Sequence, residues 1–353
     1  MGPSTPTKNF LYIGAGVGAV GSGFWRAAFG FFLTFLVAPG FVRAAEPPLT
    51  LERGIALPGV SGRIDHLAVD VRRGHLFVAA LGNDSVEVID LAAGTVLHHL
   101  SGLKEPQGIG YDPRNDMLAV ASAGDGTVRL FRGDDFSPAG VVALGEDADD
   151  VRLDAKSGRF IIGYGSGGLA LLDPSSRSVL RKVALPAHPE GFEFDPDSGS
   201  AFVNLPDAGM ISVVDLAGRA PPANWPVPHG LRANFPMAID AENHLLAVVF
   251  RRPARLLLLD MKDGSIKANV AACNDADDVF VDATRHRLYL SCGEGVVEVI
   301  QQDGGQYRET ARVPTRSGAR TALYVPQMDR LFVAAPAGLL GSDATVLVLK
   351  PKE

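Results

Sequence analysis

Apolar and polar residues alternate in short runs through most of the chain, and turn residues separate the runs. Examples are "HLAVD", "HLFVAA" and "VEVIDL", in which β-branched and other apolar residues recur at every second position. Alternation with a period of two predicts half-buried β-strands, whereas an amphipathic helix would show a period of 3.6 residues. Gly, Pro and Asp between the runs predict tight turns. We therefore expect an all-β protein.

One unit of strands and turns recurs seven times. Its first strand ends at a turn residue, and successive copies of that residue are 42, 42, 41, 45, 42 and 44 positions apart. A second strand, a Gly-rich loop, a third strand and a weaker fourth strand follow in each unit. Four antiparallel strands in a unit of this length are typical of a propeller blade. The seven turn residues are Asp70, Asp112, Asp154, Asp195, Asp240, Asp282 and Pro326.

The seventh unit lacks its fourth strand, and a matching segment stands near the start of the chain. "LERGIALPG" (Leu51–Gly59) is similar to "LRKVALPAH" (Leu180–His188), the fourth strand of the third unit. We therefore expect Leu51–Pro58 to complete the seventh blade, which closes the ring and protects its ends. The predicted fold of residues 45–353 is a seven-bladed β-propeller.

The first 44 residues differ from the rest of the chain. They contain no Asp or Glu, and an apolar run of 16 residues, "AAFGFFLTFLVAPGFV", ends at Val42, the first residue of "VRA" (residues 42–44). This arrangement predicts a secretory signal peptide over residues 1–44 and a periplasmic or secreted protein. The alternative is an uncleaved membrane anchor, although the run is short for a membrane span. The start codon could also lie downstream of Met1.

Without this leader the protein is acidic. The leader carries three of the 33 basic residues, which leaves 30 Lys and Arg against 40 Asp and Glu, a net charge of −10. An acidic domain without a basic stripe is a poor candidate for nucleic acid or for an anionic membrane surface. The expected partner is a protein, a glycan or a small molecule, and membrane contact is expected only through a retained leader.

The strand sequences resemble a known family. Second strands such as "LFVAA" and "LYLSC", followed by third strands such as "VEVIDLAAGTV", resemble the YVTN-type β-propeller repeat of YncE-like proteins. The resemblance covers nearly all of residues 45–353, and "RAPPANWPVPHGLR" and "FRRPARL" depart from it in blades 4 and 5. It implies an exported bacterial protein without an established catalytic site.

The sequence "DADDV" occurs twice, at Asp147–Val151 and at Asp275–Val279. In a propeller the first strand of each blade lines the central channel. The apolar residues one and three positions before each turn residue are expected between blades, so positions two and four must face the channel. Asp150 and Asp278 share position four in blades that lie roughly 154° apart in a seven-fold ring. We therefore expect them to face each other across the channel mouth.

Other charged residues are expected at the same mouth. Crowded carboxylates repel one another, so they either have raised pKa values or recruit a cation. Asp150 and Asp278 could hold a divalent cation, Ca²⁺, Mg²⁺, Mn²⁺ or Zn²⁺. Alternatively, the carboxylates are solvated or cap turns. The candidate ligand-binding residues are His66, Asp149, Asp150, His188, Glu190, Asp277, Asp278 and Arg320.

Two further side-chain pairs are predicted. Arg152 and Glu193 lie at one depth in adjacent blades, where we expect an ion pair that lines the channel rather than a substrate site. Cys273 precedes the first strand of blade 6 and Cys292 ends its second strand. Folding that hairpin places Asp277 opposite Cys292, which predicts a Cys273–Cys292 disulfide in an exported protein. Two separate buried thiols are the alternative.

Two functions are consistent with these patterns. The sequence contains no G-x-S-x-G, HExxH or CxxC motif, so nothing identifies a catalytic nucleophile. We favour a binding or scaffold propeller that presents its channel mouth to a partner. The alternative is a metal-dependent, lactonase-like hydrolase, in which Asp150 and Asp278 hold the cation and an acid or His66 moves protons.

Overall fold

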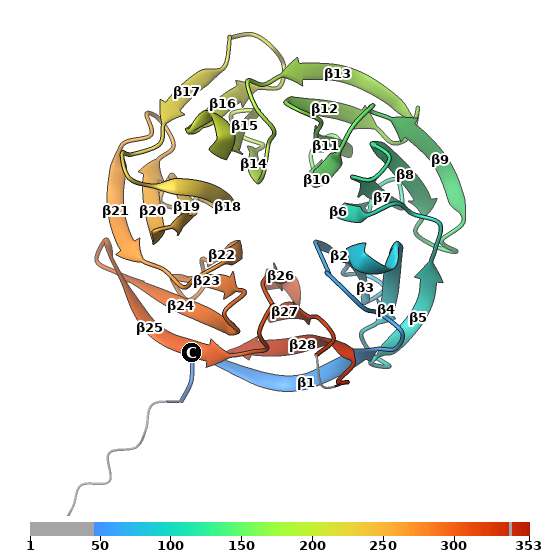
Figure 1. The fold of residues 1–353 in the computed structure, drawn as a ribbon. Coiled ribbons are helices and arrows are strands. Elements are labelled where there is room, and N and C mark those ends of the chain that lie inside the picture. Colours follow the sequence, from blue (N-terminus) through green and yellow to red (C-terminus); the bar gives the residue numbers. More distant parts are fainter. Residues whose placement is uncertain (1–45, 339–340) are drawn as a thin grey trace, which may run out of the picture. The chain divides into compact units, whose positions relative to one another are not determined.

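The described part of the chain consists of β-strands joined by short turns. The computed structural model describes residues 46–338 and 341–353. In these residues seven antiparallel sheets of four strands are arranged in a ring (Figure 1). This confirms the predicted seven-bladed β-propeller. No helix among the described residues is long and apolar enough to cross a membrane. The predicted signal peptide or anchor lies outside the described residues.

Each blade begins beside the channel and ends at the rim. The first strands are β2 (Leu67–Asp70), β6 (Pro106–Asp112), β10 (Ala148–Asp154), β14 (Phe192–Asp195), β18 (Arg232–Asp240), β22 (Ala276–Asp282) and β26 (Thr321–Val325). The second strands are β3 (His75–Ala80), β7 (Met117–Ser122), β11 (Arg159–Tyr164), β15 (Ser200–Leu205), β19 (Leu245–Arg252), β23 (Arg287–Cys292) and β27 (Arg330–Ala335).

The two outer strands of each blade follow the same order. The third strands are β4 (Ser85–Asp90), β8 (Thr127–Arg132), β12 (Gly168–Asp173), β16 (Met210–Asp215), β20 (Ala254–Asp260), β24 (Val296–Asp303) and β28 (Ala344–Pro351). The fourth strands are β5 (Thr95–Leu100), β9 (Pro138–Ala143), β13 (Ser178–Ala184), β17 (Ala223–Pro226), β21 (Ile266–Ala271), β25 (Gln306–Pro314) and β1 (Leu49–Leu57). Short 3-10 helices form some of the turns between strands, namely η1 (Leu81–Asn83), η2 (Pro206–Ala208) and η3 (Pro326–Met328).

The N-terminal strand closes the ring. β1 pairs antiparallel with β28, from Leu49 opposite Pro351 to Leu57 opposite Ala344. Figure 1 shows β1 outside β28, in the blade that also contains β26 and β27. The structure therefore has the closure that the sequence predicts, with a strand that begins two residues earlier than expected. We number the blades 1 to 7 from the one that begins with β2, so β1 belongs to blade 7.

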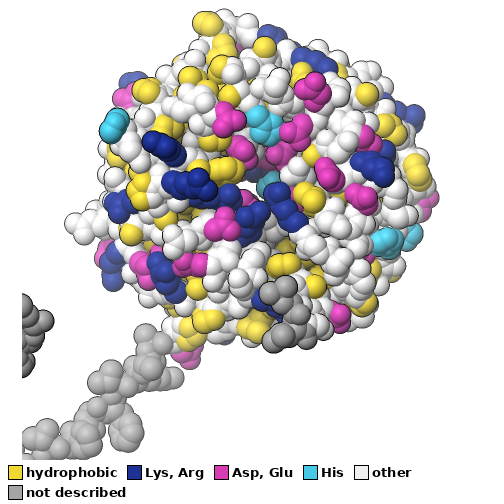
Figure 2. Space-filling view, viewed as in Figure 1, with side chains coloured by type: hydrophobic (Ala, Val, Ile, Leu, Met, Phe, Trp, Pro, Cys, Tyr) yellow, Lys and Arg dark blue, Asp and Glu magenta, His cyan; other side chains and the backbone are white. Residues whose placement is uncertain are grey.

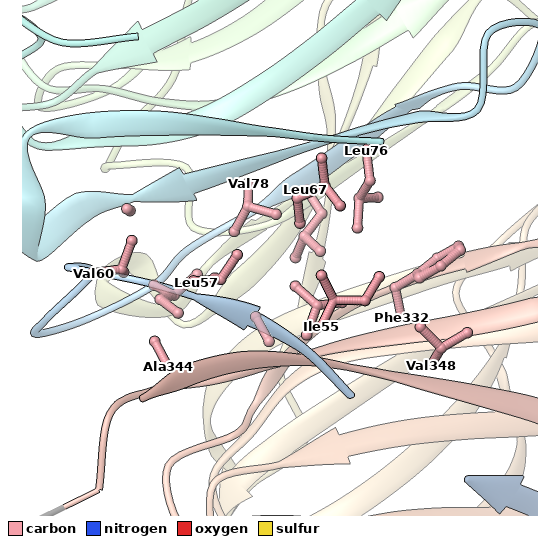
Figure 3. Packing of buried hydrophobic residues seen from close by; sticks show 14 of the residues in the cluster. Ile55, Leu57, Val60, Leu67, Leu76, Val78, Phe332, Ala344 and Val348 are labelled. Carbon is pink, nitrogen blue, oxygen red and sulfur yellow. The ribbon is translucent and has the colours of Figure 1, made fainter. Parts of the chain in front are cut away.

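The hydrophobic core consists of clusters between neighbouring blades. At the junction of blades 7 and 1, Ile55 and Leu57 of β1 pack with Leu76 and Val78 of β3 and with Phe332 of β27 (Figure 3). These side chains are almost fully buried. Equivalent clusters fill the other six junctions. Burial of these apolar faces holds each blade against the next, and it fixes which ends of the first strands surround the channel.

One predicted strand register is wrong by one residue. Ala276, rather than Asp277, lies opposite Cys292, and Asp278 lies opposite Ser291. A β-bulge at Asp277 causes the difference, because the bulged strand places two residues against one on its partner. The prediction paired residues by counting outward from the turn of a regular hairpin, and such a count does not allow for the extra residue of a bulge.

Candidate functional site

Both DADDV segments reach one pocket at the channel mouth, which we call the mouth pocket. Its volume is about 370 Å³, and all seven blades contribute side chains to it. On the face seen in Figure 2, acidic, basic and histidine side chains gather around the central hollow. Its ionisable lining residues are Asp65, Asp147, Asp149, Asp150, Glu190, Asp277, Asp278, Arg63, Arg152, Arg251, Arg320, His66 and His188. All eight candidate ligand-binding residues are among them, and their role in binding stays a prediction.

β-Bulges aim consecutive aspartates at the pocket. In β10 the register shifts between Ala148 and Val151, so Asp149 and Asp150 lie within a bulge. β22 contains a bulge at Asp277. A bulge interrupts the alternation of side chains, so neighbouring residues no longer have to point to opposite faces. Both acids of each pair therefore line the pocket, which strict alternation does not predict.

Asp150 and Asp278 face the shared pocket, and each has its own local partner. Asp150 is only 1% exposed, and its Oδ1 atom contacts Nη1 of Arg152. Its Oδ2 atom has no hydrogen-bond partner among the described residues. Oδ2 of Asp278 accepts a hydrogen bond from the backbone N–H of Ala322 at 2.7 Å. Burial raises the pKa of Asp278 to about 7, although nearby His66 opposes the shift.

His66 lies between acids of several blades. Its Nε2 atom is 3.8 Å from Oδ1 of Asp65 and 3.9 Å from Oδ1 of Asp150. Burial disfavours the imidazolium, but Asp150, Asp65 and Asp278 outweigh it and raise the pKa of His66 to about 9. Burial also raises the pKa of Asp65 to about 6, while His66 and Arg63 oppose that shift. His66 is therefore a cation at neutral pH, despite its partly buried position.

A second histidine organises the side of the pocket formed by blades 3 and 4. Nδ1 of His188 lies 2.6 Å from the carbonyl oxygen of Gly165, and Nε2 lies 3.4 Å from Oδ2 of Asp149. The hydrogen bond to Asp149 raises the pKa of His188 to about 9 against the effect of burial. The side chain of Glu190 has no hydrogen-bond or ionic partner in the described part of the chain. Burial, followed by the charge of Asp149, raises the pKa of Glu190 to about 7.

Two arginines hold the second DADDV segment. Arg251 contacts Asp277, lies 3.6 Å from Asp275, and covers the ring of Phe235 at 4.1 Å from its centroid. Nε of Arg320 lies 2.9 Å from Oδ2 of Asp277. Sequence reasoning identified Arg320 but missed Arg251. The missed signal was "FRRP", because this segment ends the second strand of blade 5 and the following loop lies beside the channel mouth.

Below the mouth, the structure contains the predicted Arg152–Glu193 ion pair, with Nε of Arg152 3.1 Å from Oε1 of Glu193. Arg152 also contacts Asp150, a partner that sequence reasoning did not foresee. The guanidinium thus joins two carboxylates of adjacent blades. Burial raises the pKa of Glu193, and the charge of Arg152 opposes this shift.

A disulfide ties the segment before β22 to the end of β23. Cys273 and Cys292 are bonded, and their Cα atoms are 6.1 Å apart. Both residues are buried. The disulfide therefore restrains the segment that leads into the second DADDV copy, as the sequence predicted.

The lining of the mouth pocket consists mainly of charged side chains. None of the described residues that line it is Ser, Thr, Cys, Tyr or Lys. Within residues 46–338 and 341–353, no group of three or more His, Cys, Asp or Glu side chains is arranged to hold a metal ion. A divalent cation between Asp150 and Asp278 stays a prediction. The pocket offers fixed charges and many hydrogen-bond acceptors.

The fold is similar to that of solved propellers. A chain in the "Crystal Structure of Mitotic Checkpoint Complex" has a TM-score of 0.74 at 14% identity, over 93% of this chain and 99% of that chain. The RRP9 WD40 repeats have a TM-score of 0.74 at 10% identity, over 85% and 97%. Kuenenia stuttgartiensis hydrazine synthase has 0.69 at 14% identity, over 87% and 98%. Such low identities show the fold alone.

Comparisons of the sequence with protein-family models and with curated proteins give no match. The structural similarities show that the chain has a β-propeller fold, which it shares with WD40 and other propellers. The finer resemblance to the YVTN-type repeat stays a prediction.

Proposed function

We propose that the protein is a non-catalytic binding propeller and that the mouth pocket receives its ligand. The observation that carries this proposal is the convergence of both DADDV segments on one pocket of about 370 Å³. Small-molecule sites usually have volumes of about 300–1,000 Å³, with a few fixed polar groups that set specificity. The ligand is a small polar molecule, or a polar group that projects from a protein or glycan partner.

The polar groups of the pocket are held in place without a ligand. The backbone N–H of Ala322 donates to Asp278, and Nε of Arg251 donates to the carbonyl oxygen of Ala276 at 2.7 Å. The guanidinium of Arg251 also rests on the ring of Phe235. Side chains that are already ordered lose little conformational entropy when a ligand binds. This supports a binding role for the mouth face.

A protein partner is consistent with the fold. One similar propeller belongs to a mitotic checkpoint complex, which is an assembly of proteins. Propellers of very different function share this architecture, so the fold alone does not choose the partner. The charged mouth pocket is the feature through which we propose that recognition takes place.

No observation favours the metal-dependent hydrolase over binding. Asp150 already contacts Arg152, and Asp278 already accepts the hydrogen bond from Ala322. Metal analysis of the purified protein tests this alternative. A stoichiometric divalent ion that is lost in the Asp150→Asn/Asp278→Asn variant would support the metal-dependent hydrolase.

We also propose that the protein is exported. The apolar run in residues 27–42 and the Cys273–Cys292 disulfide support this proposal, since disulfides persist in oxidising compartments. N-terminal analysis of the protein from an exported fraction tests it. A mature chain that starts at Ala45 is the expected result, and a full-length chain in the cytoplasm would contradict it.

A thermal-shift screen of the purified protein against small polar molecules tests the binding proposal. A ligand of the mouth pocket should stabilise the wild type and lose most of this effect in Glu190→Gln. Asp197→Asn is a matched control, because Asp197 is an exposed carboxylate that pairs with Lys156 outside the pocket. If every stabilising ligand stabilises Glu190→Gln as much as the wild type, the site lies elsewhere and the proposal fails.

A further inference from the structure

The mouth pocket contains more carboxyl groups than cations. Seven carboxyl groups and four guanidinium groups line it, together with the two histidines. With all of these groups ionised, the seven carboxylates exceed the six cations by one. Two carboxyl groups outside the lining also form ion pairs with these arginines, namely Glu193 with Arg152 and Asp275 with Arg320. The electrostatic field of the pocket is therefore negative.

The arginines are already occupied, which argues against an anionic ligand. Nη2 of Arg63 lies 2.7 Å from Oδ2 of Asp65. Nε of Arg152 lies 3.1 Å from Glu193. Arg251 and Arg320 share the carboxylates of the second DADDV segment. An incoming anion would have to displace a carboxylate that is already bonded, so it would gain little.

Asp150 and Glu190, in blades 3 and 4, have carboxylate oxygens that are free to accept hydrogen bonds. Asp150 is 1% exposed and lines the pocket, and its Oδ2 has no hydrogen-bond partner among the described residues. Glu190 likewise has no partner for its side chain in that part of the chain. The buried Oδ2 atom of Asp150 is costly without a donor, and a donor from a ligand would offset this cost. Glu190 is only partly buried, so its oxygens are open to a ligand or to water. Asp149 adds a third carboxylate on the same side, next to Asp150 in the bulge of β10.

We propose that the mouth pocket selects small organic cations that carry N–H donors, such as primary amines or guanidines, and holds the charged nitrogen among Glu190, Asp149 and Asp150. This inference rests on the proposed binding function and names the chemical class of the ligand. Charge-assisted N–H hydrogen bonds to carboxylates are about twice as strong as neutral ones. The acceptors match a cation that brings several donors.

The same geometry favours a cation with N–H donors over a quaternary ammonium ion and over a divalent metal ion. A quaternary ammonium ion binds best in a cage of Phe, Tyr or Trp rings, but Phe235, the one such residue among the described pocket residues, is covered by Arg251. A bare divalent ion needs about six oxygen ligands in a close shell. Asp150 and Asp278, the predicted cation ligands, already contact Arg152 and the backbone N–H of Ala322, respectively. A pocket of about 370 Å³ also leaves room for a ligand of many atoms.

Calorimetric titration of the full-length protein tests the proposal. The probes are 1,4-diaminobutane and agmatine, with the fully N-methylated diamine, succinate and CaCl₂ as comparisons. The amine and the guanidine should bind saturably, whereas the methylated diamine and succinate should bind at least about tenfold more weakly. Glu190→Gln and Asp150→Asn should each weaken binding of the two N–H cations at least about tenfold.

Controls separate this inference from the proposed function. Glu242→Gln changes an exposed carboxylate outside the pocket and should bind like the wild type. Circular dichroism verifies that each variant is folded, and Glu190→Gln suffices if Asp150→Asn does not fold. If succinate or CaCl₂ binds more tightly and depends on Glu190, the pocket is a site for another ligand class and only this inference fails. If no probe binds, or the methylated diamine equals the parent diamine, the inference is also overturned.

Discussion

The Nε2 atom of His66 lies 3.9 Å from Oδ1 of Asp150, so a side chain of blade 1 reaches a carboxylate of blade 3 across the channel mouth. Blade 2 lies between them and has Gly108 at the matching position. A Cβ atom on Gly108 would overlap the carbonyl oxygen of Asp149 and would lie 2.9 Å from the backbone nitrogen of Val151. The missing side chain thus allows the bulge of β10 to lie against blade 2.

Gly108→Ala should therefore destabilise the protein. The added methyl group meets backbone atoms that cannot move without opening the bulge, and we expect a loss of about 1–3 kcal/mol in the free energy of unfolding. Gly102→Ala is the control, because Gly102 has a left-handed φ of 76° but no neighbour within 4 Å of an added Cβ. Gly102→Ala should lower the free energy of unfolding by about 1 kcal/mol. Urea unfolding measures both, and equal losses would contradict the packing argument.

The ring closure by β1 should depend on its buried face. Ile55 is 1% exposed at the junction of blades 7 and 1, whereas Leu51 of the same strand is 59% exposed. Ile55→Ala should lower the free energy of unfolding by about 2–5 kcal/mol, because it leaves a cavity in a packed core. Leu51→Ala should change it by less than about 0.5 kcal/mol. Chemical unfolding of the two variants checks this, and similar losses would show that β1 does not seal the ring.

The disulfide should stabilise blade 6. Cys273 and Cys292 are separated by 19 positions, and closing a loop of this size in the unfolded chain is worth about 3 kcal/mol. The Cys273→Ser/Cys292→Ser variant should therefore lose about 2–4 kcal/mol in the free energy of unfolding. Reduction of the wild type should have a comparable effect, which is measured by urea unfolding with and without dithiothreitol. An unchanged midpoint in both experiments would refute the prediction.

The stability of the protein should fall as the pH rises. The folded pKa values of Asp65, Glu190 and Asp278 are raised to about 6, 7 and 7, and those of His66 and His188 to about 9. A group with a raised folded pKa binds its proton more tightly in the folded state. Its stabilising contribution is present below the unfolded pKa and is lost as the pH rises through the folded value.

The unfolding free energy should therefore decline from about pH 4 to about pH 7 through the three acids, and on to about pH 9 through the histidines. The expected decline is on the order of 1 kcal/mol for each group. Glu190→Gln should flatten the lower part of this profile, because it removes one of the titrating carboxyls. Urea midpoints at a series of pH values measure the profile. Parallel profiles for the wild type and Glu190→Gln would contradict the assignment.

Much of the fold could be predicted because the repeat makes each strand visible several times. The likeness of Leu51–Pro58 to the fourth strand of blade 3 predicted the weak strand β1, which the structure places at Leu49–Leu57. Alternation also located Asp150 and Asp278 at the channel, since the apolar residues beside them had to face the neighbouring blades. Local periodicity and packing between blades thus agree in this part of the molecule.

The details of the site could not be predicted in the same way. The bulges at Asp149 and Asp277 depend on how neighbouring blades meet, and they break the period on which the prediction relies. Arg251 reaches Asp277 from the adjacent blade, a contact between residues 26 positions apart. Nor could the sequence show that Arg152 contacts Asp150, because residues two apart in a regular strand share a face without fixed rotamers.

Titration of the histidines tests the central claim, that both acidic segments face one pocket, most directly. NMR spectra of the eight histidines should show His66 and His188 with pKa values of about 9. Asp150→Asn/Asp278→Asn should lower the pKa of His66 by at least about one unit and leave that of His188, whose main partner is Asp149, nearly unchanged. If His66 titrates near its ordinary value of 6.5 in the wild type, or ignores the double substitution, the two segments do not share a pocket.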